Sequence, residues 1–228
     1  MDEEFFEHFH QARREFENAE IEKLVRPGLN RLKMVGLNLE DLSHHQTVLD
    51  LGAGEGYIAR AVNARKMNTR VISMDVEPPP LEITNLGLPF YQFDLTKPKE
   101  WPSDVMLGEP TLAISKQGPL FISSHEPAAR AFLEQALSKI KESGEFRVYP
   151  VRFNFIIQQL FGDDPKYWEL KRKLLKDLLS DPVNNQFNLE ANKQSQKWLS
   201  ENRFKFQTRK IENFDGPSSN SEYLVLTK

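Results

Sequence analysis

The residues with the clearest chemical meaning are three glycines at alternate positions, Gly52, Gly54 and Gly56. A glycine has no β-carbon, so it adopts positive φ easily and allows a ligand to lie directly against the backbone. The apolar run 47–51 before them predicts a buried strand, and the apolar spacing in 57–62 predicts a helix. Such a strand, glycine turn and helix bind ligands at the carboxyl ends of open α/β sheets, at the positive end of the helix.

The spacing of the glycines separates the cofactor classes. A dinucleotide-binding turn has the pattern Gly-x-Gly-x-x-Gly, but the residue three positions after Gly54 is Tyr57. A Walker phosphate loop requires Gly-Lys-Ser/Thr, which is absent here. The remaining pattern, Asp50-x-Gly52-x-Gly54-x-Gly56, resembles motif I of the class I S-adenosylmethionine (SAM) dependent methyltransferases. A strand-to-helix connection without a ligand is the alternative at this point.

Two further acids agree with the resemblance. The run 71–74 predicts a second strand that ends in Asp75, where the fold places an acid for ribose hydroxyls. The run 90–95 resembles the third strand of the family, whose terminal acid, here Asp94, accepts a hydrogen bond from the adenine amino group. Three acids at three successive strand ends therefore support a SAM site.

The resemblance implies a role for each of these residues, with S-adenosylhomocysteine (SAH) as the product. Asp50 would help to fix the methionine end of SAM, Asp75 would hold the ribose, and Asp94 would mark the adenine edge. Two apolar residues, Val76 and Leu95, would flank the adenine ring. The implied cofactor-binding residues are Asp50, Gly52, Ala53, Gly54, Gly56, Asp75, Val76, Asp94, Leu95 and Ser115.

The elements that follow in the chain match the same fold. Strands are predicted at 111–115 and 146–151 with a helix at 128–141 between them, and an antiparallel pair of strands at 204–211 and 222–226. Three consecutive prolines, 78–80, reduce the helix between the second and third strands to 81–86. We therefore expect a doubly wound α/β fold with a seven-stranded, mostly parallel sheet and an antiparallel last strand.

Two segments carry no motif of the family. Residues 1–42 are predicted as an N-terminal helical cap, with an amphipathic helix that stops near Pro27-Gly28 and a shorter second helix. Phe9 on the apolar stripe of that helix is a candidate for substrate contact, and simple core packing of the stripe is the alternative. The methyltransferase domain is expected to span 43–228, with a helical insertion at 153–203.

The acceptor side departs from the best-known methyltransferase signature. Ser115-Lys116-Gln117-Gly118 stands where amino-group methyltransferases carry Asn/Asp-Pro-Pro-Tyr, which argues against methylation of adenine or glutamine nitrogen by that device. His125 in the following loop is the candidate general base, and a purely helix-capping role is the alternative. The candidate substrate residues near the ends of the fourth and fifth strands are Lys116, Tyr149 and Arg152, of which Arg152 could pair with an acceptor carboxylate or phosphate.

Composition excludes several other classes. The 228 residues are 39% hydrophobic and 28% charged with a net charge of −3, which is ordinary for a globular domain and gives no global attraction for nucleic acid or anionic membrane. The absence of cysteine excludes disulfides, iron–sulfur clusters and thiolate zinc sites, and no other metal site is expected. Because no signal peptide or apolar run of about 18 residues is visible, we expect a cytoplasmic protein without membrane insertion.

The sequence therefore predicts methyl transfer from SAM, most simply to a small-molecule acceptor, by in-line displacement in which alignment supplies much of the catalysis. A protein or RNA methyltransferase is the second hypothesis, since the stretch 171–176 is basic. The third is a binding or scaffold protein that keeps the fold without turnover.

Overall fold

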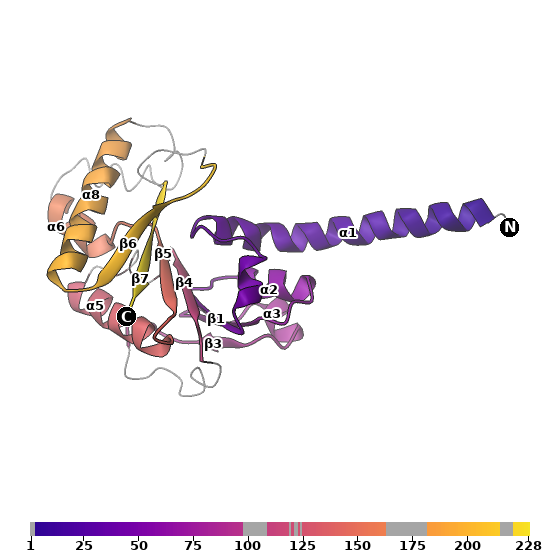
Figure 1. Ribbon diagram of the computed structural model, residues 1–228, viewed down its shortest axis with the longest axis horizontal. Coiled ribbons are helices and arrows are strands. Elements are labelled where there is room, and N and C mark those ends of the chain that lie inside the picture. Colours follow the sequence, from indigo (N-terminus) through magenta and orange to yellow (C-terminus); the bar gives the residue numbers. More distant parts are fainter. Residues whose placement is uncertain are drawn as a thin grey trace.

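The computed structural model describes residues 3–97, 109–118, 120, 123, 125–162, 182–214 and 221–228. Its centre is a seven-stranded sheet with the order β3-β2-β1-β4-β5-β7-β6 (Figure 1). The strands are β1 (Thr47–Leu51), β2 (Arg70–Asp75), β3 (Phe90–Gln92), β4 (Leu112–Lys116), β5 (Glu145–Tyr149), β6 (Lys205–Lys210) and β7 (Glu222–Thr227). Neighbours from β3 to β5 pair in parallel, whereas β7 is antiparallel to both β5 and β6. The predicted fold class is confirmed.

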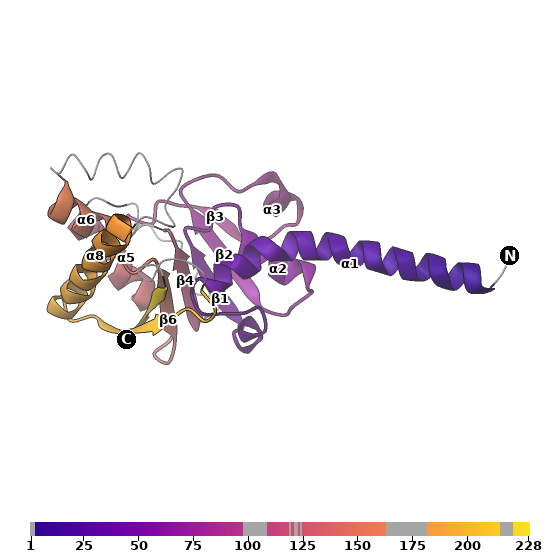
Figure 2. The same ribbon diagram turned by 90° about the horizontal axis from the view of Figure 1, so that it is seen from above.

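Helices cover both faces of the sheet. They are α1 (Glu3–Lys33), α2 (Tyr57–Ala64), α3 (Leu81–Asn85), α5 (Glu126–Lys139), α6 (Asn154–Phe161) and α8 (Pro182–Glu201), with a short 3-10 helix η1 (Asp41–His44). One core cluster joins the sheet to α1, α2 and α3, and the other joins it to α5, α6 and α8 (Figures 1 and 2). Within the described residues, no helix is both long and apolar enough to cross a bilayer.

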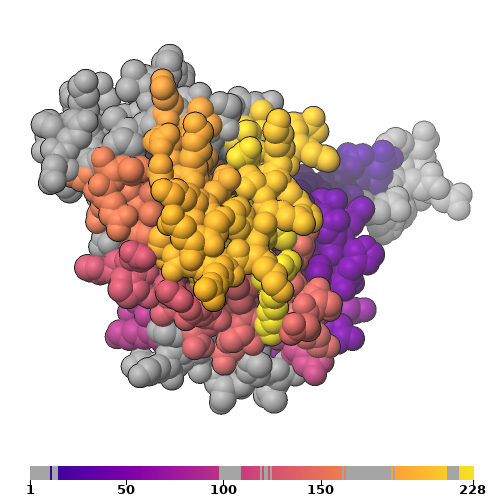
Figure 3. Space-filling model, turned by 60° about the vertical axis from the view of Figure 1, so that its left-hand side comes forward, coloured from indigo at the N-terminus to yellow at the C-terminus, as the bar shows by residue number. Residues whose placement is uncertain are grey.

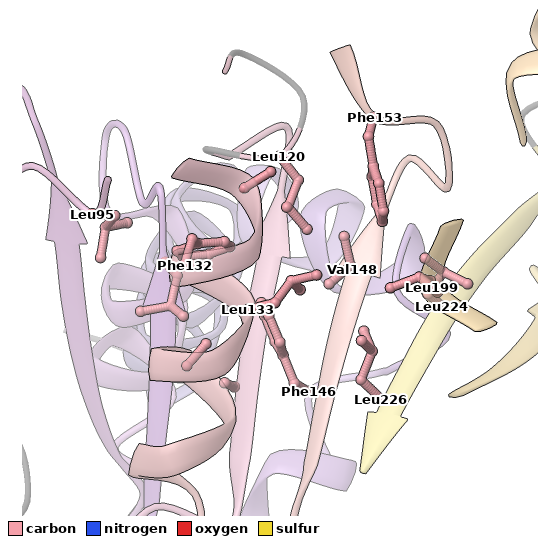
Figure 4. Packing of buried hydrophobic residues seen from close by; sticks show 14 of the residues in the cluster. Leu95, Leu120, Phe132, Leu133, Phe146, Val148, Phe153, Leu199, Leu224 and Leu226 are labelled. Carbon is pink, nitrogen blue, oxygen red and sulfur yellow. The ribbon is translucent and has the colours of Figure 1, made fainter. Parts of the chain in front are cut away.

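Side chains of β5 alternate between the two faces of the sheet and so contribute to both core clusters. Phe146 and Val148 belong to the cluster under α5, where Phe132 and Leu133 also lie (Figure 4). Tyr149, one position further along, belongs to the cluster under α1 and α2. Successive side chains of a strand point to opposite faces, so this sheet is buried on both sides, as expected for parallel strands between helices.

The first helix differs from the prediction. It was expected to stop near Pro27-Gly28, but α1 continues to Lys33, so that prediction is wrong. Gly28 is there for packing, since a β-carbon on it would lie 2.7 Å from the Tyr57 carbonyl oxygen and 2.7 Å from the Ala61 β-carbon of α2. The absence of this β-carbon lets α1 cross α2 closely and fixes where the last turns of α1 lie.

The two ends of α1 have different surroundings. From Val25 onward the helix has buried residues, whereas 15–20 are exposed and Phe16 retains 67% of its accessible surface. Both ribbon views show the N-terminal part projecting away from the sheet (Figures 1 and 2). At the other end, the Arg147 guanidinium donates to the carbonyls of Val35 and Gly36, at 3.1 and 2.8 Å, and so anchors the chain where it leaves α1.

The described part of the predicted insertion is helical and packed against the sheet. Trp198 of α8 lies with its ring centroid 5.8 Å from that of Phe153 and 5.1 Å from that of Phe155, and its indole nitrogen donates to Glu126 at 2.7 Å. Figure 3 shows α8 and the β6–β7 pair as one continuous surface. The basic stretch 171–176 lies outside the described residues.

Candidate cofactor and acceptor site

One cavity lies at the carboxyl edge of the sheet, where four parallel strands end. It has a volume of about 260 Å³ and is lined by Gly52, Asp75, Val76, Phe93, Asp94, Leu95, Thr96, Gln117, Gly118 and Ser123. These residues follow β1, β2, β3 and β4, so segments that are far apart in the sequence meet at one site. Five of the predicted cofactor residues line the cavity: Gly52, Asp75, Val76, Asp94 and Leu95.

The glycine turn has the backbone that its sequence predicts. Gly52, Gly54 and Gly56 have φ of 78°, 55° and 63°. A β-carbon on Gly56 would lie 2.6 Å from Ile83, whereas one on Gly54 would have no atom within 4 Å. Gly56 is therefore required by the fold, and Gly54 leaves an open space above the backbone.

Asp75 connects the glycine turn to the end of β2. Its Oδ2 accepts a hydrogen bond from the Gly54 amide at 2.8 Å, and its Oδ1 accepts one from the Glu77 amide at 3.1 Å. The side chain is partly exposed and lines the cavity. A carboxylate has about four acceptor positions, so this one keeps capacity for hydroxyl donors of a ligand.

The adenine-side residues lie in a loop rather than on a strand. The third strand was expected to run to Leu95, but β3 ends at Gln92, and that boundary is wrong. The Asp94 Oδ1 accepts hydrogen bonds from the Thr96 hydroxyl at 2.6 Å and from its amide at 3.0 Å. These bonds lower the pKa of Asp94, so the carboxyl group is ionised at neutral pH.

Asp50 is fully buried and does not line the cavity. Its Oδ1 accepts two hydrogen bonds from the Arg31 guanidinium, 2.9 Å from Nη2 and 3.2 Å from Nε, and Nη2 also donates to the Gly52 carbonyl. Burial raises the pKa of Asp50, and the positive charge of Arg31 opposes that shift. The Oδ2 atom of Asp50 has no hydrogen-bond partner among the described residues.

Sequence reasoning missed Arg31. Asp50 at the end of the first predicted strand could have indicated that a cation lies nearby, because a buried carboxylate requires a partner. The sequence does not show which Lys or Arg residue is that partner. The missing β-carbon of Gly28 allows the close crossing of α1 over α2, and this crossing delivers Arg31 to the turn.

The four other predicted cofactor residues lie outside the cavity lining. The Ala53 amide donates to the Met74 carbonyl at 3.0 Å, beside an equivalent bond from Gly52 at 2.8 Å, and holds the turn against β2. Ser115 is buried and does not line the cavity, and its hydroxyl oxygen packs so close to Gly118 that a β-carbon there would lie 2.2 Å from it. Gly54 and Gly56 likewise lie outside the cavity lining.

The predicted substrate residues gather at the ends of β4 and β5. Lys116 and Tyr149 are register partners, and Arg152 follows three residues later with 8% of its surface exposed. Burial and the charge of Arg31 lower the pKa of Lys116, while Asp50 opposes the shift. Burial likewise raises the pKa of Tyr149 and lowers that of Arg152. The carboxyl edge therefore has basic side chains on its β4–β5 side.

His125, the candidate general base, does not line this cavity. His125 is exposed, precedes α5 and makes no side-chain capping bond, and it is not among the residues that line the cavity. Phe9 belongs to α1, but its side chain lies outside the described residues. Among the side chains that the structure describes, no group of three or more His, Asp or Glu could hold a metal ion.

Comparison with known proteins gives a match in fold but not in sequence. No family model and no curated protein matches the sequence. An O-methyltransferase family protein from Burkholderia thailandensis superposes with a TM-score of 0.50 and 16% identity over 98% of this chain and 61% of its own. The complex of human N-acetylserotonin methyltransferase with SAM gives 0.50 and 16%, over 93% of this chain and 55% of its own.

A third structure matches along most of both chains. The plantazolicin methyltransferase BpumL in complex with SAH has a TM-score of 0.50 and 12% identity, over 96% of this chain and 92% of its own. This chain thus spans less than two thirds of the first two proteins and nearly all of the third. Its fold is that of the class I SAM-dependent methyltransferases.

Proposed function

We propose that this protein binds SAM at the carboxyl edge of its sheet and transfers the methyl group to a small molecule. The observation that carries the proposal is the cavity in which Gly52, Asp75 and Asp94 meet from the ends of three parallel strands. Each of them matches a position at which the family contacts SAM, and together they offer open backbone and two carboxylates. The likeness in fold to proteins solved with SAM and SAH supports the same cofactor.

The charged groups beside the turn fit the methionine end of SAM, which carries a carboxylate and an ammonium group. Arg31 donates to the carbonyl of Gly52, and Gly52 lines the cavity, so we assign the methionine carboxylate to the Arg31 guanidinium. Asp50 is buried under Arg31 and holds that guanidinium in place. In this proposal Asp50 is a positioning residue, which revises the direct contact expected from the sequence.

The chemistry requires little from the protein beyond alignment. SAM supplies an electrophilic methyl carbon, and in-line attack by the acceptor depends on its orientation and on exclusion of water. In this proposal Asp75 would hold the ribose, the Gly54 backbone would leave room beside it, and the acceptor would approach from the ends of β4 and β5. A general base is needed only for an acceptor that is protonated at working pH.

The choice of a small acceptor is the finer part of the proposal. Two of the neighbours in fold are named for N-acetylserotonin and for plantazolicin, and this chain carries a net charge of −3, which does not favour nucleic acid. Protein or RNA methylation remains the second hypothesis, and a scaffold that binds SAM without turnover is the third.

A transfer assay with methyl-labelled SAM separates these hypotheses. The protein would be incubated with the small-molecule, protein and RNA fractions of a cell extract, with Asp75→Ala as the inactive control. We expect label in the small-molecule fraction with the wild type alone. Label in protein or RNA would move the second hypothesis to first place. SAM binding without label in any fraction would favour the scaffold.

A further inference from the structure

The geometry points to an acceptor that carries an anionic group, a carboxylate or a phosphate, recognised by Lys116. This inference rests on the proposed function, because it takes the ends of β4 and β5 as the place where the acceptor meets the methyl group. It adds the chemical class of the substrate, which neither the fold nor the resemblance to the methyltransferases specifies.

The first observation is how charge is distributed along the carboxyl edge. On the β2–β3 side, the cavity is lined by two carboxylates, Asp75 and Asp94, which suit the hydroxyl and amino donors of a nucleoside. On the β4–β5 side, the charged side chains at the strand ends are Lys116 and Arg152. Along the carboxyl edge of the sheet, hydrogen-bond acceptors therefore lie on the side proposed for the cofactor, and cationic donors lie on the side proposed for the substrate.

The second observation is that Lys116 is held without an ion pair. Its side chain is partly buried, and in the described part of the chain no carboxylate lies within 4.0 Å of its Nζ. Asp50, whose charge acts on Lys116, already binds the Arg31 guanidinium. Burying a cation without a partner costs free energy, and an incoming anion would supply the missing partner.

The third observation concerns the neighbours of Lys116 on the acceptor side. Tyr149 is its register partner, so their Cα atoms are about 4.8 Å apart across the parallel ladder. Tyr149 is 9% exposed and Arg152 is 8% exposed, so both are held in place by the surrounding packing. The Arg152 charge acts on the Tyr149 hydroxyl. Lys116 and the Tyr149 phenol, at adjacent strand ends, can both donate to an anion.

Arg31 and Lys116 lie at different strand ends, and we assign them different ligands for that reason. Arg31 comes from α1 and contacts the Gly52 carbonyl, over the end of β1 where the methionine moiety lies in our proposal. Lys116 comes from the end of β4, and its register partner is Tyr149 at the end of β5, the side on which we place the acceptor. Arg31 therefore serves the cofactor carboxylate, and Lys116 serves the acceptor.

The test uses SAH-saturated protein and three probes: benzoate, phenyl phosphate and the neutral isostere benzamide. Calorimetry first measures SAH affinity, and nuclear magnetic resonance titration then measures probe affinity and the resonance of the Lys116 side chain. We expect at least one anion to bind about tenfold more tightly than benzamide and to move that resonance. Lys116→Gln should abolish the preference and leave SAH affinity within about threefold. Lys116→Arg should keep the preference, as should the control Lys193→Gln at an exposed position of α8.

The outcomes are separable from those for the proposed function. If the wild type does not bind SAH, the proposed function fails before any probe is added. If SAH binds but benzamide binds as tightly as both anions, or no probe binds, the anionic acceptor is rejected. A large loss of SAH affinity in Lys116→Gln would also reject it, because Lys116 would then belong to the cofactor. Preference for one anion identifies carboxylate or phosphate as the group.

Discussion

The two halves of the carboxyl edge are built in different ways. On the side where we propose the nucleoside (the nucleoside side), the glycine turn and Asp75 belong to consecutive strand ends, and the Gly54 amide donates to the Asp75 carboxylate at 2.8 Å. On the side where we propose the methionine group and the acceptor, Arg31 comes from α1 and Lys116 from β4, and their positions depend on helix packing and strand register. The first half is formed by residues that are close in the sequence, whereas the second is formed by residues that only the tertiary fold brings together.

The largest effect is expected from breaking the ion pair that joins these halves. Arg31→Met leaves the buried Asp50 carboxylate without its partner, which we expect to lower the free energy of unfolding by about 3–5 kcal/mol. Urea denaturation measures the loss. Adding Asp50→Asn removes the unpaired charge and should recover a large part of it. If the single and double variants were equally unstable, the pair would have no special role.

The glycine turn offers a matched pair of substitutions on the nucleoside side. Gly56→Ala adds strain at positive φ and an overlap with Ile83, so it should cost roughly 1–3 kcal/mol of stability. Gly54→Ala meets no atom of the chain and should cost about 1 kcal/mol, while SAM affinity falls because the β-carbon enters the ligand space. Thermal unfolding and calorimetry give the two readouts. Unchanged SAM affinity in Gly54→Ala would remove the turn from the site.

A smaller effect is expected from the amino end of the sheet, which the proposed site does not use. His45 Nδ1 lies 2.7 Å from the Thr111 hydroxyl, and burial lowers the pKa of His45 below 6.5. As the pH falls, His45 therefore takes up a proton in the unfolded chain before it does so in the folded protein. Its contribution to the free energy of unfolding is fully present above pH 6.5 and is lost as the pH falls through the lowered pKa of the folded state. The loss should stay below about 1 kcal/mol, since the ring is partly solvated.

Denaturation at several pH values, with His45→Gln beside the wild type, isolates this contribution. The variant should show a flatter decline of stability below pH 6.5. An identical decline in both proteins would assign the pH dependence to other groups. SAM affinity should not follow His45 in either case, because the residue lies at the opposite edge from the cavity.

The smallest effect is expected at His125. Its side chain is exposed and lies outside the cavity lining, so we expect His125→Ala to keep SAM affinity and to change the rate of methyl transfer by less than about twofold. Once an acceptor is known, steady-state kinetics measure this directly. A rate loss of 100-fold or more would restore the general base that the sequence suggested, since such bases contribute at least about that much.

The difference between the halves also explains what the sequence could reveal. The apolar run, the glycines and Asp75 are close in the chain and have fixed spacing, so the first strand, the glycine turn, the following helix and the end of the second strand could be predicted from the pattern. The reduced helix after the three prolines is also seen, as α3 from Leu81 to Asn85. Local constraints on the backbone are visible in the local sequence.

The rest depends on tertiary packing. Pro27-Gly28 has the composition of a helix stop, but Gly28 is required where α1 crosses α2, and this contact lies 29 residues away in the sequence at Tyr57. Arg31 is one of 30 Lys and Arg residues, and only the crossing of two helices selects it. The burial of Asp50, which makes it a partner of Arg31 rather than a cavity residue, likewise requires the folded protein.

The most direct test of the account is calorimetric titration of SAM and SAH into the wild type and Asp75→Ala, with Lys193→Gln as an exposed control. Asp75 makes two backbone hydrogen bonds and lines the cavity, so circular dichroism and thermal unfolding would verify that the variant is folded. We predict micromolar binding to the wild type and the control, and a loss of at least about 100-fold in Asp75→Ala. Absence of binding to the wild type, or equal binding to folded Asp75→Ala, would contradict the account.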